Sequence, residues 1–154
     1  TIFDYWSVDT IRRWRNGGKF DGKMLTEDQK HIYSIYQRIL TLCNKEKAIT
    51  EGEFFDLMYA NANGWRFNEH KQYTFLRKAG KKLLFIIVNF DHISVDVAIN
   101  VPSHAFDFLQ IPQMDIYPAV DLLTGKTESI SLLPYKATEV SVEGYSGKIL
   151  KIKL

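Results

Sequence analysis

The chain of 154 residues is long enough for one globular domain, or for one domain and part of another. Its 20 basic and 18 acidic residues leave a net charge of +2, which is too close to balance to favour nucleic acid or an anionic membrane as a partner. No apolar segment approaches the ~18 residues of a membrane-spanning helix. The single cysteine, Cys43, excludes a disulfide framework and a thiolate metal site.

The first fifty residues carry helical signals. A short helix is predicted after Ser7, a residue able to cap it, and Asn16-Gly17-Gly18 marks its end. A longer helix is predicted over 27–44, because Thr26 and Gln29 have capping-box spacing and apolar side chains then recur every three or four residues. The apolar face of this helix consists of Ile32, Ile35, Tyr36, Ile39, Leu40 and Cys43.

Beyond Gly52 the hydrophobic period becomes two, which is typical of strands. Strands are expected at 55–59, 73–78, 83–90, 95–101, 128–132, 137–142 and 148–154. The segment LLFIIVNF (83–90) is apolar on both faces, which indicates a central strand. No helix is expected between the strands, so the pattern predicts a mainly β protein, an antiparallel Greek-key β-sandwich preceded by a helical segment.

The segment LTEDQKHIYSIYQRILTLCNKEKAITEGEF contains the predicted long helix and the residues that follow it. This segment and the order of the strands after it resemble the C-terminal end of α-amylase-family glycoside hydrolases, in which it looks like the last helix of a (β/α)8 barrel and its exit. The antiparallel sandwich of that family, called domain C, has four similar elements in the same order: a hairpin, the strand that follows it, a turn late in the domain and the closing strand. The matching motifs in this chain are, in that order, YTFLRKAGKKLLFIIVNFD, VDVAINVP, DLLTGK and GKILKIKL. The resemblance covers essentially the whole chain and implies a barrel tail over 1–51 and a domain C sandwich over 52–154.

The resemblance also implies what lies outside this sequence. TIFDYW is similar to a segment in the loop after the eighth barrel strand, so we expect Thr1 to mark a cut inside a larger enzyme. A retaining glycosidase needs two carboxylates about 5–5.5 Å apart, and in this family they lie on barrel strands upstream of that loop. We therefore expect no catalytic residue, no cofactor and no metal site in this chain.

The implied function is that of a non-catalytic region of an α-amylase-like enzyme that cleaves or rearranges α-glucosidic bonds. The expected role is to cap and stabilise the catalytic barrel of the same parent chain, which is the expected partner. Whether the parent hydrolyses, transfers or isomerises such bonds stays open, because members of all three kinds share this architecture. An isolated chain is expected either to form a homodimer through the apolar face of helix 27–44 or to fold this helix onto the sandwich.

Two groups of aromatic residues are candidates for contact with an α-glucan. Tyr5 and Trp6 would lie on a loop at the active-site face of the barrel. Trp65, with Tyr59 and Phe67 beside a predicted turn at 61–64, would form a surface platform and make the sandwich an accessory glucan-binding module. Packing inside the protein is the competing interpretation for each group, and an interaction domain unrelated to sugar is a further alternative.

Overall fold

The computed structural model describes residues 8–154, which divide into a unit ending at Thr41 and a second unit, Leu42–Leu154. In the first unit, α1 (Asp9–Arg15) leads through the short 3-10 turn η1 (Asn16–Gly18) to α2 (Glu27–Lys45), which continues into the second unit. The predicted capping box of α2 is confirmed: Gln29 N donates to Thr26 Oγ1 at 3.3 Å, and Thr26 N donates to Gln29 Oε1 at 3.0 Å. Ser7, the predicted cap of the first helix, lies outside the described residues.

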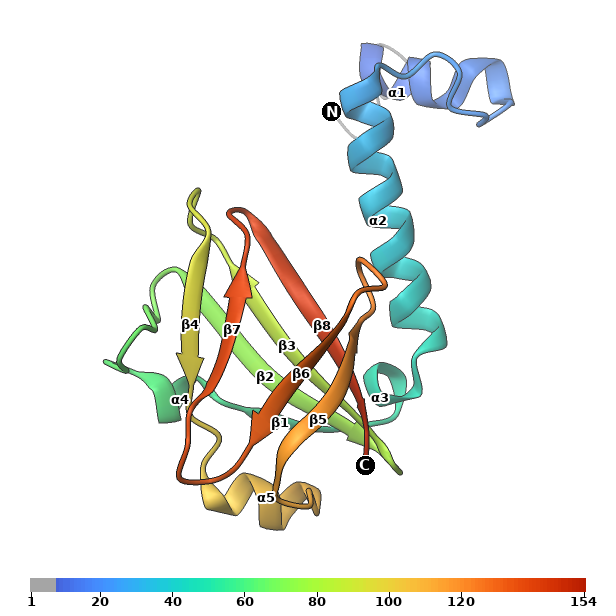
Figure 1. Ribbon diagram of the computed structural model, residues 1–154. Helices are drawn as coiled ribbons and strands as arrows, with labels where there is room; N and C mark the ends of the chain where they lie inside the picture. The colour runs from blue at the N-terminus through green and yellow to red at the C-terminus, as the bar shows by residue number, and fades with distance from the viewer. Residues whose placement is uncertain (1–7) are drawn as a thin grey trace. The chain divides into compact units, whose positions relative to one another are not determined.

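The second unit is an antiparallel β-sandwich (Figure 1). Its strands are β1 (Glu53–Asp56), β2 (Gln72–Ala79), β3 (Lys82–Asn89), β4 (Val95–Ile99), β5 (Met114–Asp121), β6 (Thr127–Leu132), β7 (Thr138–Val142) and β8 (Ser146–Lys153). One sheet has the order β1-β2-β3-β8-β5-β6, and β4 pairs with β7 in the other. The last strand, β8, lies between β3 and β5, so the centre of the larger sheet is formed by strands that are far apart in sequence. The predicted mainly β sandwich fold is confirmed.

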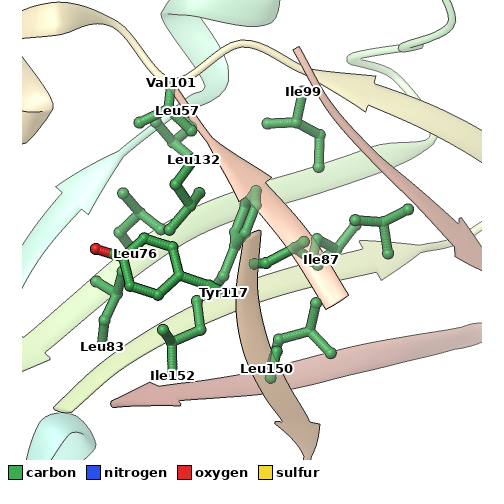
Figure 2. Packing of buried hydrophobic residues seen from close by; sticks show 14 of the residues in the cluster. Leu57, Leu76, Leu83, Ile87, Ile99, Val101, Tyr117, Leu132, Leu150 and Ile152 are labelled. Carbon is green, nitrogen blue, oxygen red and sulfur yellow. The ribbon is translucent and has the colours of Figure 1, made fainter. Parts of the chain in front are cut away.

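The hydrophobic core lies between the two sheets (Figure 2). Strand β3 is central, as predicted, and pairs along its whole length with β2 and β8. Its residues Leu83, Phe85 and Ile87 point into this core and are fully buried. Each such side chain stabilises the fold by about 1.5–3 kcal/mol relative to an exposed position, so β3 is the strand on which the larger sheet depends.

The expectation that no helix separates the strands is wrong at two places. The observed strand β1 ends at Asp56, so only positions 55 and 56 of the predicted strand 55–59 are extended. Asp56 Oδ1 accepts a hydrogen bond from Met58 N at 3.1 Å, and α4 (Met58–Asn61) begins there. The second helix, α5 (Ser103–Leu109), follows Pro102 and buries Ala105, Phe106 and Leu109. A two-turn helix gives too short an apolar pattern to be recognised in the sequence.

A further helix, α3 (Lys47–Thr50), packs on the larger sheet, where Ala48 is fully buried. Arg77 of β2 donates to the carbonyl oxygens of Ala48 and Gly52, at 2.9 and 2.7 Å. These contacts explain why the second compact unit begins before the sandwich strands do. The division predicted at residues 51 and 52 concerns the larger enzyme and stays a prediction.

Asn61, at the end of α4, joins this helix to the segment after β4. Its side chain is fully buried and donates to the carbonyl oxygens of Leu57 and Asn100, at 2.8 and 3.0 Å. Its Oδ1 accepts a hydrogen bond from Asn100 N at 2.7 Å. The amide therefore satisfies three backbone groups that burial would otherwise leave unpaired.

We predict that Asn61→Ala lowers the free energy of unfolding by about 2–4 kcal/mol, because several buried polar groups lose their partners at once. Chemical denaturation of the 154-residue chain measures this loss. Asn100→Ala is the matched control, since it deletes the same amide from an exposed side chain, and we expect it to change stability by less than about 0.5 kcal/mol. Equal losses in the two variants would contradict the assigned role of Asn61.

Candidate functional site

Trp65 lies in the turn after α4 with 71% of its surface exposed. The turn is fixed by Gly64 N, which donates to Asn61 O at 2.9 Å, and by Asn63 N, which donates to Glu69 Oε2 at 3.0 Å. A Cβ at Gly64 would lie 2.8 Å from Asn61 O, so only glycine allows this close approach. The predicted turn at 61–64 therefore presents an indole to solvent from a well-anchored backbone.

Arg66 holds the Trp65 ring from one side. Its guanidinium carbon lies 5.1 Å from the ring centroid, which is within cation–π range. The guanidinium is itself fixed, because Nε donates to Asp96 O at 3.0 Å and Nη1 to Glu139 Oε2 at 3.3 Å. Since the indole remains largely exposed, it can still stack on an apolar ligand surface.

The other members of the predicted platform do not join Trp65 as an aromatic surface. Phe67 is 6% exposed and belongs to the hydrophobic core. The ring of Tyr59 contacts Phe55 and His104, with centroids 6.4 and 5.8 Å apart. Tyr59 is itself 56% exposed, but its ring contacts are with these two residues, so the structure leaves Trp65 without another ring of the predicted platform beside it. Tyr5 and Trp6 lie outside the described residues.

A second aromatic group, which the sequence did not indicate, joins β1, α4 and α5. Tyr59 Oη and His104 Nε2 form a hydrogen bond, and Phe108 packs against Phe55 with centroids 5.9 Å apart. Burial, with a smaller contribution from the Asp56 carboxylate, raises the pKa of Tyr59 above its ordinary value. Because 45 residues separate Tyr59 from His104, no local sequence pattern reveals the pair.

The larger sheet has a second apolar face, which we call the outer face. It carries Leu84 and Ile86 of β3, which are nearly fully buried, and the partly buried side chains Ile49, Phe75, Ala79, Val88, Leu122 and Ile149. Helix α3 contributes Ala48 to this cluster. The alternation of β3 explains both faces, since successive side chains of a strand point to opposite sides.

Aromatic side chains on β1 and β2 extend the outer face. Phe75 contacts Phe54 and Tyr73, with ring centroids 5.4 and 5.7 Å apart. Phe54 is 47% exposed and Tyr73 is 38% exposed. Exposed rings on both sides of a partly buried one form an apolar surface of the kind that marks an interaction site.

Glu46 lies beside the outer face and has a buried carboxylate. Only 7% of the surface of Glu46 is exposed, and its Oε2 forms an ion pair with Lys151 Nζ of β8 at 2.5 Å. Its other oxygen, Oε1, is one of two buried side-chain polar atoms without a hydrogen-bond partner in the described part of the chain. Such an atom is costly unless a further donor satisfies it.

The predicted apolar face of α2 is present, and its side chains are exposed. Ile32, Ile35, Tyr36, Ile39 and Leu40 each have between 38 and 64% of their surface exposed. None of the residues of α2 is buried. A helix with such a face is normally stabilised by packing against another element.

Residues 8–154 contain no cluster of three or more histidine, cysteine, aspartate or glutamate side chains arranged to hold a metal ion. Among the helices of this same range, none is both long enough and apolar enough to span a membrane.

Compared by sequence, the chain matches no protein-family model and no curated protein. Compared by structure, it is similar to several α-amylases. The maltogenic α-amylase AmyB of Thermotoga neapolitana matches with a TM-score of 0.62 and 14% identity over 86% of this chain and 27% of that one. The structure of AmyP in complex with maltose matches with a TM-score of 0.58 and 21% identity over 86% and 23% of the two chains.

The α-amylase of Geobacillus thermoleovorans, complexed with acarbose, matches with a TM-score of 0.57 and 11% identity, over 87% of this chain and 26% of that one. The chain thus spans about a quarter of the length of these structures. The fold defines this chain as a β-sandwich region that is similar to one portion of these longer chains. It is the fold of a portion of α-amylase-family glycoside hydrolases, which confirms the resemblance predicted from the sequence.

Proposed function

We propose that this chain is a non-catalytic region of an α-amylase-like enzyme that cleaves or rearranges α-glucosidic bonds, and that it caps and stabilises the catalytic barrel. The observation that carries the proposal is the outer face of the larger sheet. A sheet that is apolar on both sides requires cover on both. The second sheet covers the inner face, whereas α3 and neighbouring side chains cover only the centre of the outer face and leave Phe54 and Tyr73 exposed.

The barrel of the parent enzyme is the occupant that fits the outer face. Matching structures are more than three times as long as this chain, so a large partner in the same polypeptide is expected. A barrel helix packed on Phe54, Phe75 and Tyr73 would bury their exposed ring surface. A donor from the same partner would satisfy Glu46 Oε1.

The apolar face of α2 supports the same proposal. In a parent enzyme this helix would be the last of the barrel, and Ile35, Ile39 and their neighbours would pack against the barrel strands. In the isolated chain the same face is available to a second copy, so we propose that the isolated chain forms a homodimer through it.

We predict that the double substitution Phe54→Ser and Tyr73→Ser destabilises the parent enzyme by about 2–4 kcal/mol, because two aromatic side chains lose a packed interface. The same pair should lower the stability of the isolated 154-residue chain by less than about 1 kcal/mol, since both rings are already partly exposed there. Thermal unfolding of both proteins measures the difference.

Tyr135→Ser is the control for this experiment, because Tyr135 is an 80% exposed ring between β6 and β7 and does not belong to the cluster of the outer face. It should leave both proteins nearly unchanged. Equal destabilisation of the parent enzyme and the isolated chain by the double substitution would show that the outer face has no barrel partner.

A second candidate function, an accessory glucan-binding module, is favoured by the exposure of Trp65. An indole that is fixed by Arg66 and open to solvent loses little conformational entropy when a flat apolar ligand stacks on it. The apolar face of a glucose unit is such a surface.

We predict that Trp65→Ala weakens retardation of the chain in gels containing amylopectin about fivefold or more, because roughly 1 kcal/mol of stacking is lost. Affinity electrophoresis measures the effect, with Phe90→Ala as a control that removes an equally exposed ring elsewhere. Unretarded migration of the unsubstituted chain would reject the accessory function and leave the capping role.

A further inference from the structure

A cavity of about 700 Å³, open to solvent, is formed in the first unit by α1 and the loop that follows it. The lining residues come from positions 9–24. The cavity is large enough for a small molecule, since ligand pockets have volumes of about 300–1,000 Å³.

The cavity is strongly basic. Arg12, Arg13, Arg15 and Lys23 line it, and Asp9 is the single carboxylate among the described lining residues. Asp9 is already paired, because its Oδ2 lies 2.6 Å from Arg13 Nε. The cavity wall therefore has more cationic groups than its own carboxylate can neutralise.

The nearby carboxylate of Asp21 does not change this balance. It accepts hydrogen bonds from Asn16 Nδ2 at 2.7 Å and from Lys23 N at 3.1 Å, and these bonds hold its pKa below the ordinary range. Its distance to Lys23 Nζ is 3.8 Å, a weak pairing for an exposed lysine. Among the residues that the structure describes, Arg12 and Arg15 have no side-chain ion pair or hydrogen bond.

The local backbone explains why these cations gather. Helix α1 ends where Asn16, Gly17 and Gly18 take φ values of 43°, 65° and 94°, and this left-handed run reverses the chain. The reversal brings Lys23 to the same cavity as the last turn of α1. The ring of Phe20 then packs on Trp14, with centroids 5.0 Å apart, which fixes the loop on the helix.

Stabilisation of the helix end does not by itself account for this charge. The C-terminus of a helix carries the equivalent of about half a negative charge, whereas three arginines occupy the last turn of α1 and a lysine joins them. The excess favours an anion in the cavity. Arginine suits a phosphate group, because its planar guanidinium donates two parallel hydrogen bonds to such oxygens.

We propose that this cavity binds the phosphate group of a phosphorylated small sugar, with Arg12, Arg15 and Lys23 as its ligands. The sugar part of the assignment rests on the proposed function, whereas the phosphate part follows from the charge and volume of the cavity. The pyranose ring would lie beside Met24 and Ile11, the apolar residues that line the cavity.

Isothermal titration of the 154-residue chain with glucose 6-phosphate and with inorganic phosphate tests the proposal. We expect saturable binding of both, with glucose 6-phosphate the tighter ligand. The double variant Arg12→Gln and Arg15→Gln should weaken binding of glucose 6-phosphate by at least about tenfold, because two charge-assisted contacts are lost. Circular dichroism establishes that each variant is folded.

Lys19→Gln is the matched control, since Lys19 lies in the same loop, is exposed and does not line the cavity. It should leave the affinity unchanged. An equal loss in this variant, or absence of saturable binding of either phosphate, would overturn the proposal. Equal affinity for both ligands would overturn the sugar assignment. It would not contradict the capping proposal, which depends on Phe54 and Tyr73.

Discussion

The structure depends on one strand that is apolar on both faces. β3 places Leu83, Phe85 and Ile87 in the core between the sheets, and Leu84 and Ile86 on the outer face. Because β3 pairs with β2 and β8 along its whole length, it positions the centre of the larger sheet. The same alternation that builds the core thus produces a second apolar face, whose centre is buried under α3 and whose edge at Phe54 and Tyr73 stays exposed. This constraint connects the fold to the proposed capping role.

Polar side chains fix the parts of the sandwich that apolar packing leaves undetermined. Asn89, at the end of β3, is buried and donates to the carbonyl oxygens of Ile93 and Glu143, which joins two loops at one end of the sheets. Asp91 follows it, and a hydrogen bond from Lys71 holds the pKa of its carboxyl below the ordinary range. Asn61 has a comparable role after α4. These side chains satisfy backbone groups of the loops that connect the strands.

The sequence predicted the parts of the fold that have long periodic patterns. Helix α2, the β2–β3 hairpin and the central position of β3 were predicted because their apolar residues repeat over several turns or along a whole strand. α4 and α5 were missed because one or two turns carry too little pattern, and the contact of Tyr59 with His104 joins segments distant in sequence. The exposure of Trp65 and the burial of Phe67, two positions later, depend on the turn at Gly64 rather than on residue type.

The central claim, that the parent barrel covers the outer face, is tested most directly by the accessibility of that face. A cysteine at position 54 (Phe54→Cys, in a Cys43→Ala background) can be labelled with a thiol reagent in the isolated chain and in the parent enzyme. The account predicts rapid labelling of the isolated chain, where Phe54 is 47% exposed, and much slower labelling in the folded parent. Equal labelling rates in the two proteins would contradict it.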